Sequence, residues 1–141
     1  MNKSTILLIL VLVLMTGAVS AAVDIIEAGP ISKVANVGTT ASINFTVNNT
    51  NPVNTTLVSF NNPITLKNSV DQTKTLVLST ISTQSLAANT SQFILSTIPI
   101  GNAFAGTYTG DIIATDSNDA TNKDQINVKI VVDPLTASFT V

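Results

Sequence analysis

Three observations predict that this 141-residue chain adopts an all-β fold, an antiparallel β-sandwich of about seven strands. Apolar and polar residues alternate along several segments, which is the period of a half-buried strand. No window carries the 3.6-residue stripe of an amphipathic helix, and the abundant Ser, Thr and Asn are poor helix formers. Clusters of Asn, Asp, Gly and Pro separate the segments. A small barrel is the alternative, and we prefer the sandwich because it needs no match between strand number and shear.

Residues 1–22 are typical of a secretory signal peptide. Lys3 supplies positive charge, residues 6–15 form an unbroken apolar run, and small residues at 18–22 follow it. The run is shorter than the about 20 apolar residues of a membrane span, so a cleaved leader is favoured over an uncleaved anchor. Cleavage after Ala21 and cleavage after Ala22 both fit. We expect a mature form that does not span a membrane and that is extracellular or held at the cell surface.

The first predicted strand covers residues 40–48. Ile43, Phe45 and Val47 fall on one side of it, and Ser42, Asn44, Thr46 and Asn48 fall on the other. The next four predicted strands cover 54–60, 64–66, 74–79 and 91–98. Their alternating apolar residues include Leu76 and Leu78 in the third of these and Phe93 and Leu95 in the fourth.

Two predicted strands close the sandwich. Residues 107–115 place Tyr108, Ile112 and Ala114 on one face. Residues 125–132 place Ile126, Val128, Ile130 and Val132 on one face. The single Tyr of the chain, Tyr108, lies at the entry to the penultimate strand of the core. This position is typical of the tyrosine corner of immunoglobulin-like sandwiches, in which the hydroxyl bonds back to a nearby backbone group. The alternative is a buried ring whose hydroxyl contacts water.

The order of these segments resembles a known family. A Gly38-Thr39-Thr40 turn leads into an aliphatic strand, and after a long middle Leu86-Ala87-Ala88-Asn89-Thr90-Ser91 leads into another. Ile98-Pro99, Ala105-Gly106-Thr107-Tyr108-Thr109-Gly110 and Ile112-Ile113-Ala114-Thr115-Asp116 follow. Over residues 31–133 this is similar to immunoglobulin-like modules of prokaryotic, notably archaeal, cell-surface and S-layer-associated proteins, such as the cell-adhesion-related (CARDB) modules. The resemblance implies an extracellular structural or adhesive module, and it carries over no catalytic residue.

The residue types that the chain lacks exclude several functions. There is no Cys, His, Trp or Arg, which excludes disulfides, thiol chemistry, a His-based triad and the usual zinc sites. Without the leader five Lys face eight acidic residues, and this mild acidity argues against nucleic acid as a partner. The acidic residues do not form the carboxylate pair of a glycosidase. We expect no enzyme and no cofactor.

Residues 116–119, Asp-Ser-Asn-Asp, offer the oxygen ligands that Ca²⁺ prefers, with Asp124 a short distance further on. The same residue types are favoured at the tip of a hairpin. The carboxylates are few for a cation that takes about 6–8 oxygen ligands. The segment is therefore predicted to be a turn, and no metal site is expected.

Four Asn-X-Ser/Thr triplets stand in the mature chain, and they begin at Asn44, Asn48, Asn54 and Asn89. Each is an acceptor for an N-glycan in a host that has the machinery. Asn44 and Asn48 lie on the predicted outward side of the strand 40–48, and Asn54 and Asn89 lie at turn edges. The alternative is chance, because a chain rich in Asn, Ser and Thr forms such triplets without selection.

The tail alternates fully. Leu135, Ala137, Phe139 and Val141 share one face, and Thr136, Ser138 and Thr140 share the other. It can be the last strand of the same sandwich, the start of a following module, or a strand donated to a neighbouring molecule.

These observations divide the chain into a signal peptide (1–22), an immunoglobulin-like β-sandwich (23–133) and a terminal strand or start of a following module (134–141). They predict a non-catalytic structural or adhesive surface module whose partners are surface proteins or cell-envelope components, including a second copy reached through the terminal strand. A carbohydrate-binding accessory module is one alternative, although most of the aromatic residues fit core positions. A filament subunit joined by strand exchange is the other.

Overall fold

A computed structural model describes residues 23–134, so the predictions for the leader and for the tail 135–141 lie outside the described part. Within residues 23–134 the chain forms strands and no helix. The strands are β1 (Val23–Ile25), β2 (Ile31–Asn36), β3 (Thr40–Asn49), β4 (Thr56–Phe60), β5 (Thr65–Asn68), β6 (Thr75–Val77), β7 (Gln84–Leu86), β8 (Ser91–Pro99), β9 (Gly106–Asp116) and β10 (Asp119–Asp133). The predicted all-β class is confirmed.

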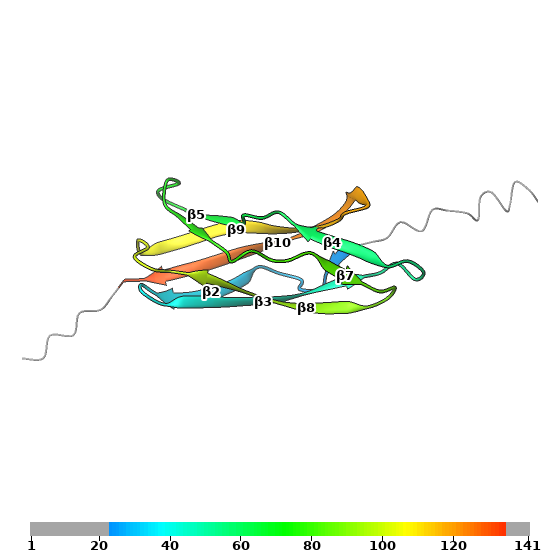
Figure 1. The fold of residues 1–141 in the computed structure, drawn as a ribbon. Helices are drawn as coiled ribbons and strands as arrows, with labels where there is room; N and C mark the ends of the chain where they lie inside the picture. Colours follow the sequence, from blue (N-terminus) through cyan, green and yellow to red (C-terminus); the bar gives the residue numbers. More distant parts are fainter. Residues whose placement is uncertain (1–22, 135–141) are drawn as a thin grey trace, which may run out of the picture.

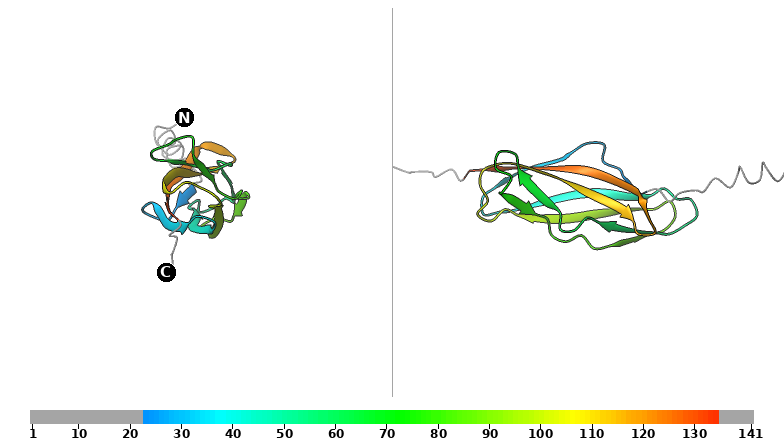
Figure 2. Two further views of the ribbon diagram at one scale, coloured as in Figure 1. Left: turned by 90° about the vertical axis from the view of Figure 1, so that its left-hand side faces the viewer. Right: turned by 90° about the horizontal axis from the view of Figure 1, so that it is seen from above.

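The strands form two layers that share one long axis (Figure 1). One sheet has the order β1-β3-β8, and the other has the order β2-β10-β9-β4-β7, with β5 joined to β9 and β6 joined to β5. The pairings between described strands are antiparallel, except that β2 runs parallel to β10. The chain passes from the first sheet to the second between β1 and β2, across Ala28-Gly29-Pro30. Figure 2 shows that the two ends of the described chain leave from opposite ends of the sandwich.

All seven segments that alternation predicted are strands, although several differ in length from the prediction. β1, β2 and β7 were not predicted. β1 and β7 are three residues long, which is too short for a period to be recognised. Only Ile31 and Ala35 of β2 are buried, and Val34 is exposed, so the apolar residues of β2 do not alternate with polar ones.

The core lies between the layers and follows the predicted faces. Ile43, Phe45 and Val47 of β3 are fully buried, and the ring of Phe45 meets that of Phe60 edge to face at 6.0 Å between centroids. The second sheet contributes Tyr108, Ile112 and Ala114 of β9 and Ile126, Val128, Ile130 and Val132 of β10. Burying both inward faces against each other is the main source of stability in such a sandwich.

The predicted facing of β8 is wrong by one residue. Ile94, Ser96 and Ile98 are buried, whereas Phe93 and Leu95 are 57% and 65% exposed. The physical reason is the register with β3, because Ile94 lies directly opposite Phe45 and residues opposite each other in an antiparallel pair share a face. Phe93, Ile94 and Leu95 are three consecutive apolar residues, so the sequence alone leaves the inward face of β8 undecided.

The segment Ala105–Gly110 packs β9 against β5. The hydroxyl of Tyr108 donates a hydrogen bond to the backbone carbonyl oxygen of Phe104 at 2.9 Å, so the predicted tyrosine corner is confirmed. Gly110 lies two residues further along the same face. A Cβ atom on Gly110 would lie 2.6 Å from the carbonyl oxygen of Thr65, so only glycine permits this approach of β5.

Candidate functional site

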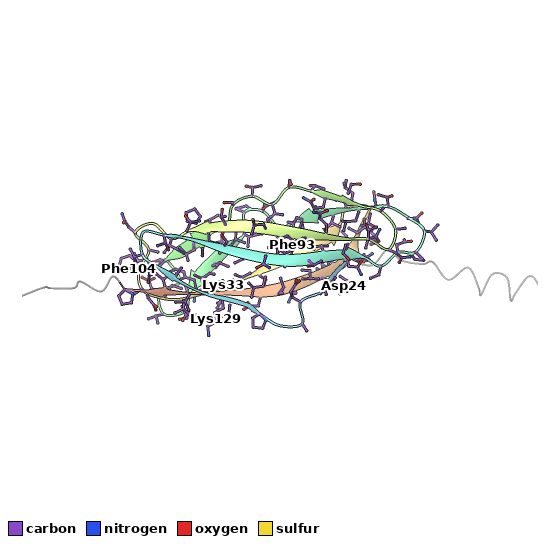
Figure 3. The ribbon with its side chains drawn as sticks, turned by 90° about the horizontal axis from the view of Figure 1, so that it is seen from below. Asp24, Lys33, Phe93, Phe104 and Lys129 are labelled. Atoms are coloured by element: carbon purple, nitrogen blue, oxygen red, sulfur yellow. The ribbon has the colours of Figure 1, made fainter. Side chains whose placement is uncertain are left out.

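The outer face of the three-stranded sheet carries two large apolar side chains in solvent. Phe93 and Leu95 of β8 point away from the core, opposite Thr46 and Asn44 of β3. We call these four residues the β3–β8 outer face. Figure 3 views the molecule from the side of this sheet and labels Phe93 near its middle. Side chains that lie directly opposite in an antiparallel pair are about 5 Å apart, so the four residues form one contiguous surface.

The same stretch of β8 is the edge of its sheet. β8 pairs with β3 on one side, and on the other side only its far end is covered, where the amide of Ser79 donates to the carbonyl oxygen of Thr97 at 2.8 Å. Backbone groups of alternate residues point to the same side of a strand. The amides of Leu95 and Phe93 therefore point away from β3 as Thr97 does, and no residue in the described part of the chain accepts a hydrogen bond from them.

A groove of about 260 Å³ runs along this open edge. It lies between β8 and the strand-free segment that precedes β7, and its walls include Ile81, Gln84, Gln92, Phe93 and Leu95. The side-chain amide of Gln92 donates to the carbonyl oxygen of Phe93 at 3.1 Å, so one outward backbone acceptor has a local partner. The groove has the place and the exposed backbone donors of a site that accepts an additional strand.

No charged residue occurs anywhere in β8, Ser91–Pro99. Natural edge strands commonly carry Lys, Pro or a bulge that discourages pairing with another chain. On β8 the only proline is Pro99 at its end, and its pairing with β3 has no register shift. β2, the edge of the other sheet, by contrast carries Lys33 in solvent. The stretch 91–95 therefore lacks these protective features.

The four predicted glycan acceptors all reach the surface. Asn44, Asn54 and Asn89 are exposed, and Asn48 is half-buried with its side-chain oxygen 3.3 Å from the hydroxyl of Ser91. Asn44 belongs to the β3–β8 outer face. The other three lie at the end of the sandwich where β3 finishes and β8 begins.

A buried polar residue that the sequence analysis missed organises that end. The side-chain amide nitrogen of Asn49 lies within 2.8–3.1 Å of the carbonyl oxygens of Asn54, Leu86 and Ala87. Its side-chain oxygen accepts from the amide of Asn51 and the hydroxyl of Thr56. Asn49 is fully buried and connects the end of β3 to the start of β4 and the end of β7. Only its position one residue beyond the alternating strand distinguishes it in the sequence.

Several acidic side chains accept hydrogen bonds from backbone amides. Asp116 accepts from the amide of Asn118, and Asp119 accepts from the amide and hydroxyl of Thr121, as the predicted hairpin turn requires. Both hydrogen bonds from Thr121 hold the pKa of Asp119 below its usual value. Asp124 accepts from the amide of Ile25 at 2.8 Å. Among residues 23–134 no three acidic residues converge as metal ligands.

A second aromatic side chain, Phe104, is 61% exposed, and Figure 3 labels it at one end of the sandwich. It borders a hollow of about 530 Å³, but the ammonium of Lys74 lies 4.5 Å from the centre of its ring. One face of Phe104 is therefore occupied by a cation–π contact. Of the other described aromatic residues, Phe45, Phe60 and Tyr108 belong to the core, as expected.

The paired sheets, the parallel β2–β10 contact and the tyrosine corner define an immunoglobulin-like β-sandwich. No protein-family model matches the sequence, and no curated protein matches it, so the resemblance is supported only at the level of this general fold. Within the described residues no helix is long and apolar enough to cross a membrane.

Solved structures of known proteins share the fold. The chain is similar to a PapD-like domain of human CEP192 (TM-score 0.57, 16% identity, 86% of this chain and 92% of that one). It is also similar to the CooA pilin subunit of enterotoxigenic Escherichia coli (TM-score 0.51, 20% identity, 80% and 99%). A family 123 glycoside hydrolase from Clostridium perfringens matches with TM-score 0.62 and 13% identity over 78% of this chain, which spans only 24% of the hydrolase.

Proposed function

We propose that this chain is a non-catalytic structural or adhesive module that works outside the cell, and that it binds other surface proteins or cell-envelope components through the β3–β8 outer face. The observation that carries the proposal is the solvent exposure of Phe93 and Leu95 side by side beside an open sheet edge. Covering a large apolar side chain contributes about 1.5–3 kcal/mol when burial is complete. This pair therefore offers a partner a binding contribution of a few kcal/mol.

The chemistry of the polar groups supports a non-catalytic role. The carboxylates of Glu27 and Asp124 accept hydrogen bonds from the backbone amides of Thr46 and Ile25. The buried Asn49 is saturated by its own neighbours. These hydrogen bonds give the three side chains a role in stabilising the sandwich.

We propose in addition that residues 1–22 direct export and are removed, and that the surface assignment follows from this. Amino-terminal sequencing of the exported protein is expected to begin at Ala22 or Val23. A protein that begins at Met1 would contradict the cleaved leader and favour an anchor.

N-glycosylation at Asn44, Asn48, Asn54 and Asn89 is a further part of the proposal. At Asn44 a glycan would lie opposite Leu95 and cover the β3–β8 outer face, so glycosylation and partner binding compete there. Peptide mass spectrometry of the exported protein tests which acceptors are used. In a glycosylating host Asn44→Gln should strengthen envelope binding if Asn44 carries a glycan, whereas Asn54→Gln should leave it unchanged.

The test of the proposed function is retention on the cell envelope. The chain is produced in an exporting host, and the fraction of exported protein that stays with washed envelopes is measured for the wild type, Phe93→Lys and Leu95→Lys. Both variants should be released into the medium. Val70→Lys, which makes the same change at a side chain that is 92% exposed in a loop, should be retained as the wild type is. Equal retention of all four proteins would contradict the proposal.

A further inference from the structure

We infer that residues 135–141 of one molecule pair as an added strand with the open edge of β8, residues 91–95, in a second copy of this chain. This inference deepens the proposed function, because it names a second copy as one partner of the β3–β8 outer face. It rests on the open backbone groups of β8, on the position of the two ends of the sandwich, and on the pattern of the tail.

Donor and acceptor lie at opposite ends of the molecule. The register pairs Val23 with Asn49 and Asn48 with Ser91, so the open stretch of β8 begins at the end where β1 begins. Asp133 pairs with Asn36, at the other end, where Thr40 faces Pro99. Figure 1 shows the chain leaving β10 at the end remote from β7 and the start of β8.

A molecule cannot readily fill its own groove with this tail. Phe93 lies six residues from Pro99, which is about 20 Å along the sandwich, and the two sheets are about 10 Å apart. Seven extended residues span about 23–25 Å at most. To reach this groove in its own molecule, the tail would have to reverse direction at the end of β10 and cross from one sheet to the other, and the crossing alone would take about three of its residues at about 3.3 Å each. A neighbouring molecule placed end to end meets the tail without this reversal.

The chemistry of the two segments matches. The tail carries four apolar residues on one face and only Ser and Thr on the other, with no charge, and β8 has no charge either. Main-chain hydrogen bonds to the outward amides of Phe93 and Leu95 would supply affinity, and side chains at alternate positions would supply specificity. The apolar face of the tail, which includes Phe139, would lie beside Phe93 and Leu95 as cross-strand neighbours.

Pairing of one end with the opposite end of the next molecule is heterologous. A heterologous contact adds molecule after molecule to an open chain, unless the rotation between neighbouring molecules closes the chain into a ring. The structure therefore points to linear chains of molecules, with the sandwiches linked end to end.

The inference is tested by complementation between two variants of the full exported chain. The acceptor variant lacks residues 135–141 and keeps the open edge. The donor variant, Leu95→Pro, keeps the tail but lacks the backbone N–H of residue 95 at the open edge. That N–H points away from β3, so its loss removes no hydrogen bond between β8 and β3. Phe93→Lys serves as a second donor variant if the proline lowers stability. Light scattering coupled to size exclusion reports the mass of each.

The wild type should grow in mass with concentration, each variant alone should remain a monomer, and their equimolar mixture should form a particle of twice the monomer mass. Hydrogen exchange at the amides of Phe93 and Leu95 should slow in the acceptor variant only when the donor is added. Val70→Lys should assemble as the wild type does. A tail peptide of the same composition with its alternation scrambled should not slow exchange, whereas the natural tail peptide should.

Several outcomes would overturn the inference. A monomeric wild type at all concentrations, or a mixture that stays monomeric, contradicts strand donation. An acceptor variant that dimerises alone would show that two β8 edges pair with each other instead. If the mixture stays monomeric while Phe93→Lys still loses envelope retention, strand donation is wrong and the proposed function stands. If the mixture pairs but Phe93→Lys is retained on envelopes as the wild type is, the proposed envelope binding is wrong and strand donation stands.

Discussion

The hydroxyl of Tyr108 donates a hydrogen bond to the carbonyl oxygen of Phe104, four residues earlier, at 2.9 Å. This bond attaches the loop that precedes β9 to the start of the strand while the ring of Tyr108 stays buried. The chain thus satisfies a polar atom at the edge of the core with a group that belongs to the same turn. The bond is local in sequence, which is why a single Tyr at the entry to a strand predicts it.

Tyr108→Phe should lower the free energy of unfolding by about 1–2 kcal/mol, because it removes one side-chain hydrogen bond and keeps the buried ring. Urea denaturation followed by circular dichroism measures the change. Thr109→Val, at the exposed neighbouring position, is the matched control and should have little effect. If Tyr108→Phe leaves the free energy of unfolding unchanged, the hydrogen bond from the hydroxyl to Phe104 contributes no more than a hydrogen bond to water would.

Phe45→Ala should cost about 3–5 kcal/mol, because it empties the centre of the core and removes the edge-to-face contact with Phe60. Asn44→Ala, one residue away on the outer face, should change stability by no more than about 0.5 kcal/mol. Chemical denaturation of both variants gives the comparison. Reversed costs would mean that β3 is shifted by one residue.

Asn49→Ala should lower stability by about 3 kcal/mol or more, because it leaves buried carbonyl oxygens and the amide of Asn51 without their partner. Asn49→Asp should cost at least as much, since a carboxylate would replace the amide donors that face three carbonyl oxygens. The neighbouring Asn48→Ala should be mild. Thermal melts of the three variants in one buffer test this order, and a mild Asn49→Ala would contradict the network.

Gly110→Ala should destabilise the protein by about 1–3 kcal/mol, because the added methyl group meets the backbone of β5, which cannot move aside as a side chain can. Gly29→Ala is the control, since nothing lies within 4 Å of its added Cβ atom. Equal denaturation midpoints for the two variants would be incompatible with the close packing of β5 on β9.

Thr121→Val should raise the pKa of Asp119, because the hydroxyl of Thr121 is the largest cause that holds this pKa below its usual value of 3.8. A lowered pKa in the folded state stabilises the protein above the unfolded value, and that contribution disappears as the pH falls through the folded pKa. NMR titration of the Asp119 carboxyl measures the shift. Asp71, whose pKa is lowered in the same way by Thr73, should titrate unchanged and is the internal control.

Much of the fold could be predicted because its determinants are local. Alternation placed Ile43, Phe45 and Val47 in the core and Asn44 in solvent, and the residue types at 116–119 predicted a hairpin tip. The corner at Tyr108 depends on a bond across four residues. In each case the structural preference is contained in a few consecutive residues, and tertiary packing agrees with it.

The location of the candidate site depends instead on tertiary structure. Phe93, Ile94 and Leu95 offer an apolar residue to either face, so only the register with β3 determines that Ile94 enters the core and that Phe93 and Leu95 face solvent. The saturation of Asn49 and the approach of Thr65 to Gly110 likewise depend on contacts between segments far apart in the chain. By itself the sequence determined the alternating period of the seven predicted strands, and for strands such as β3 also which side chains face the core. The pairing of strands decided which surface was left open, because a strand forms an edge only if no other strand of the fold pairs with its free side.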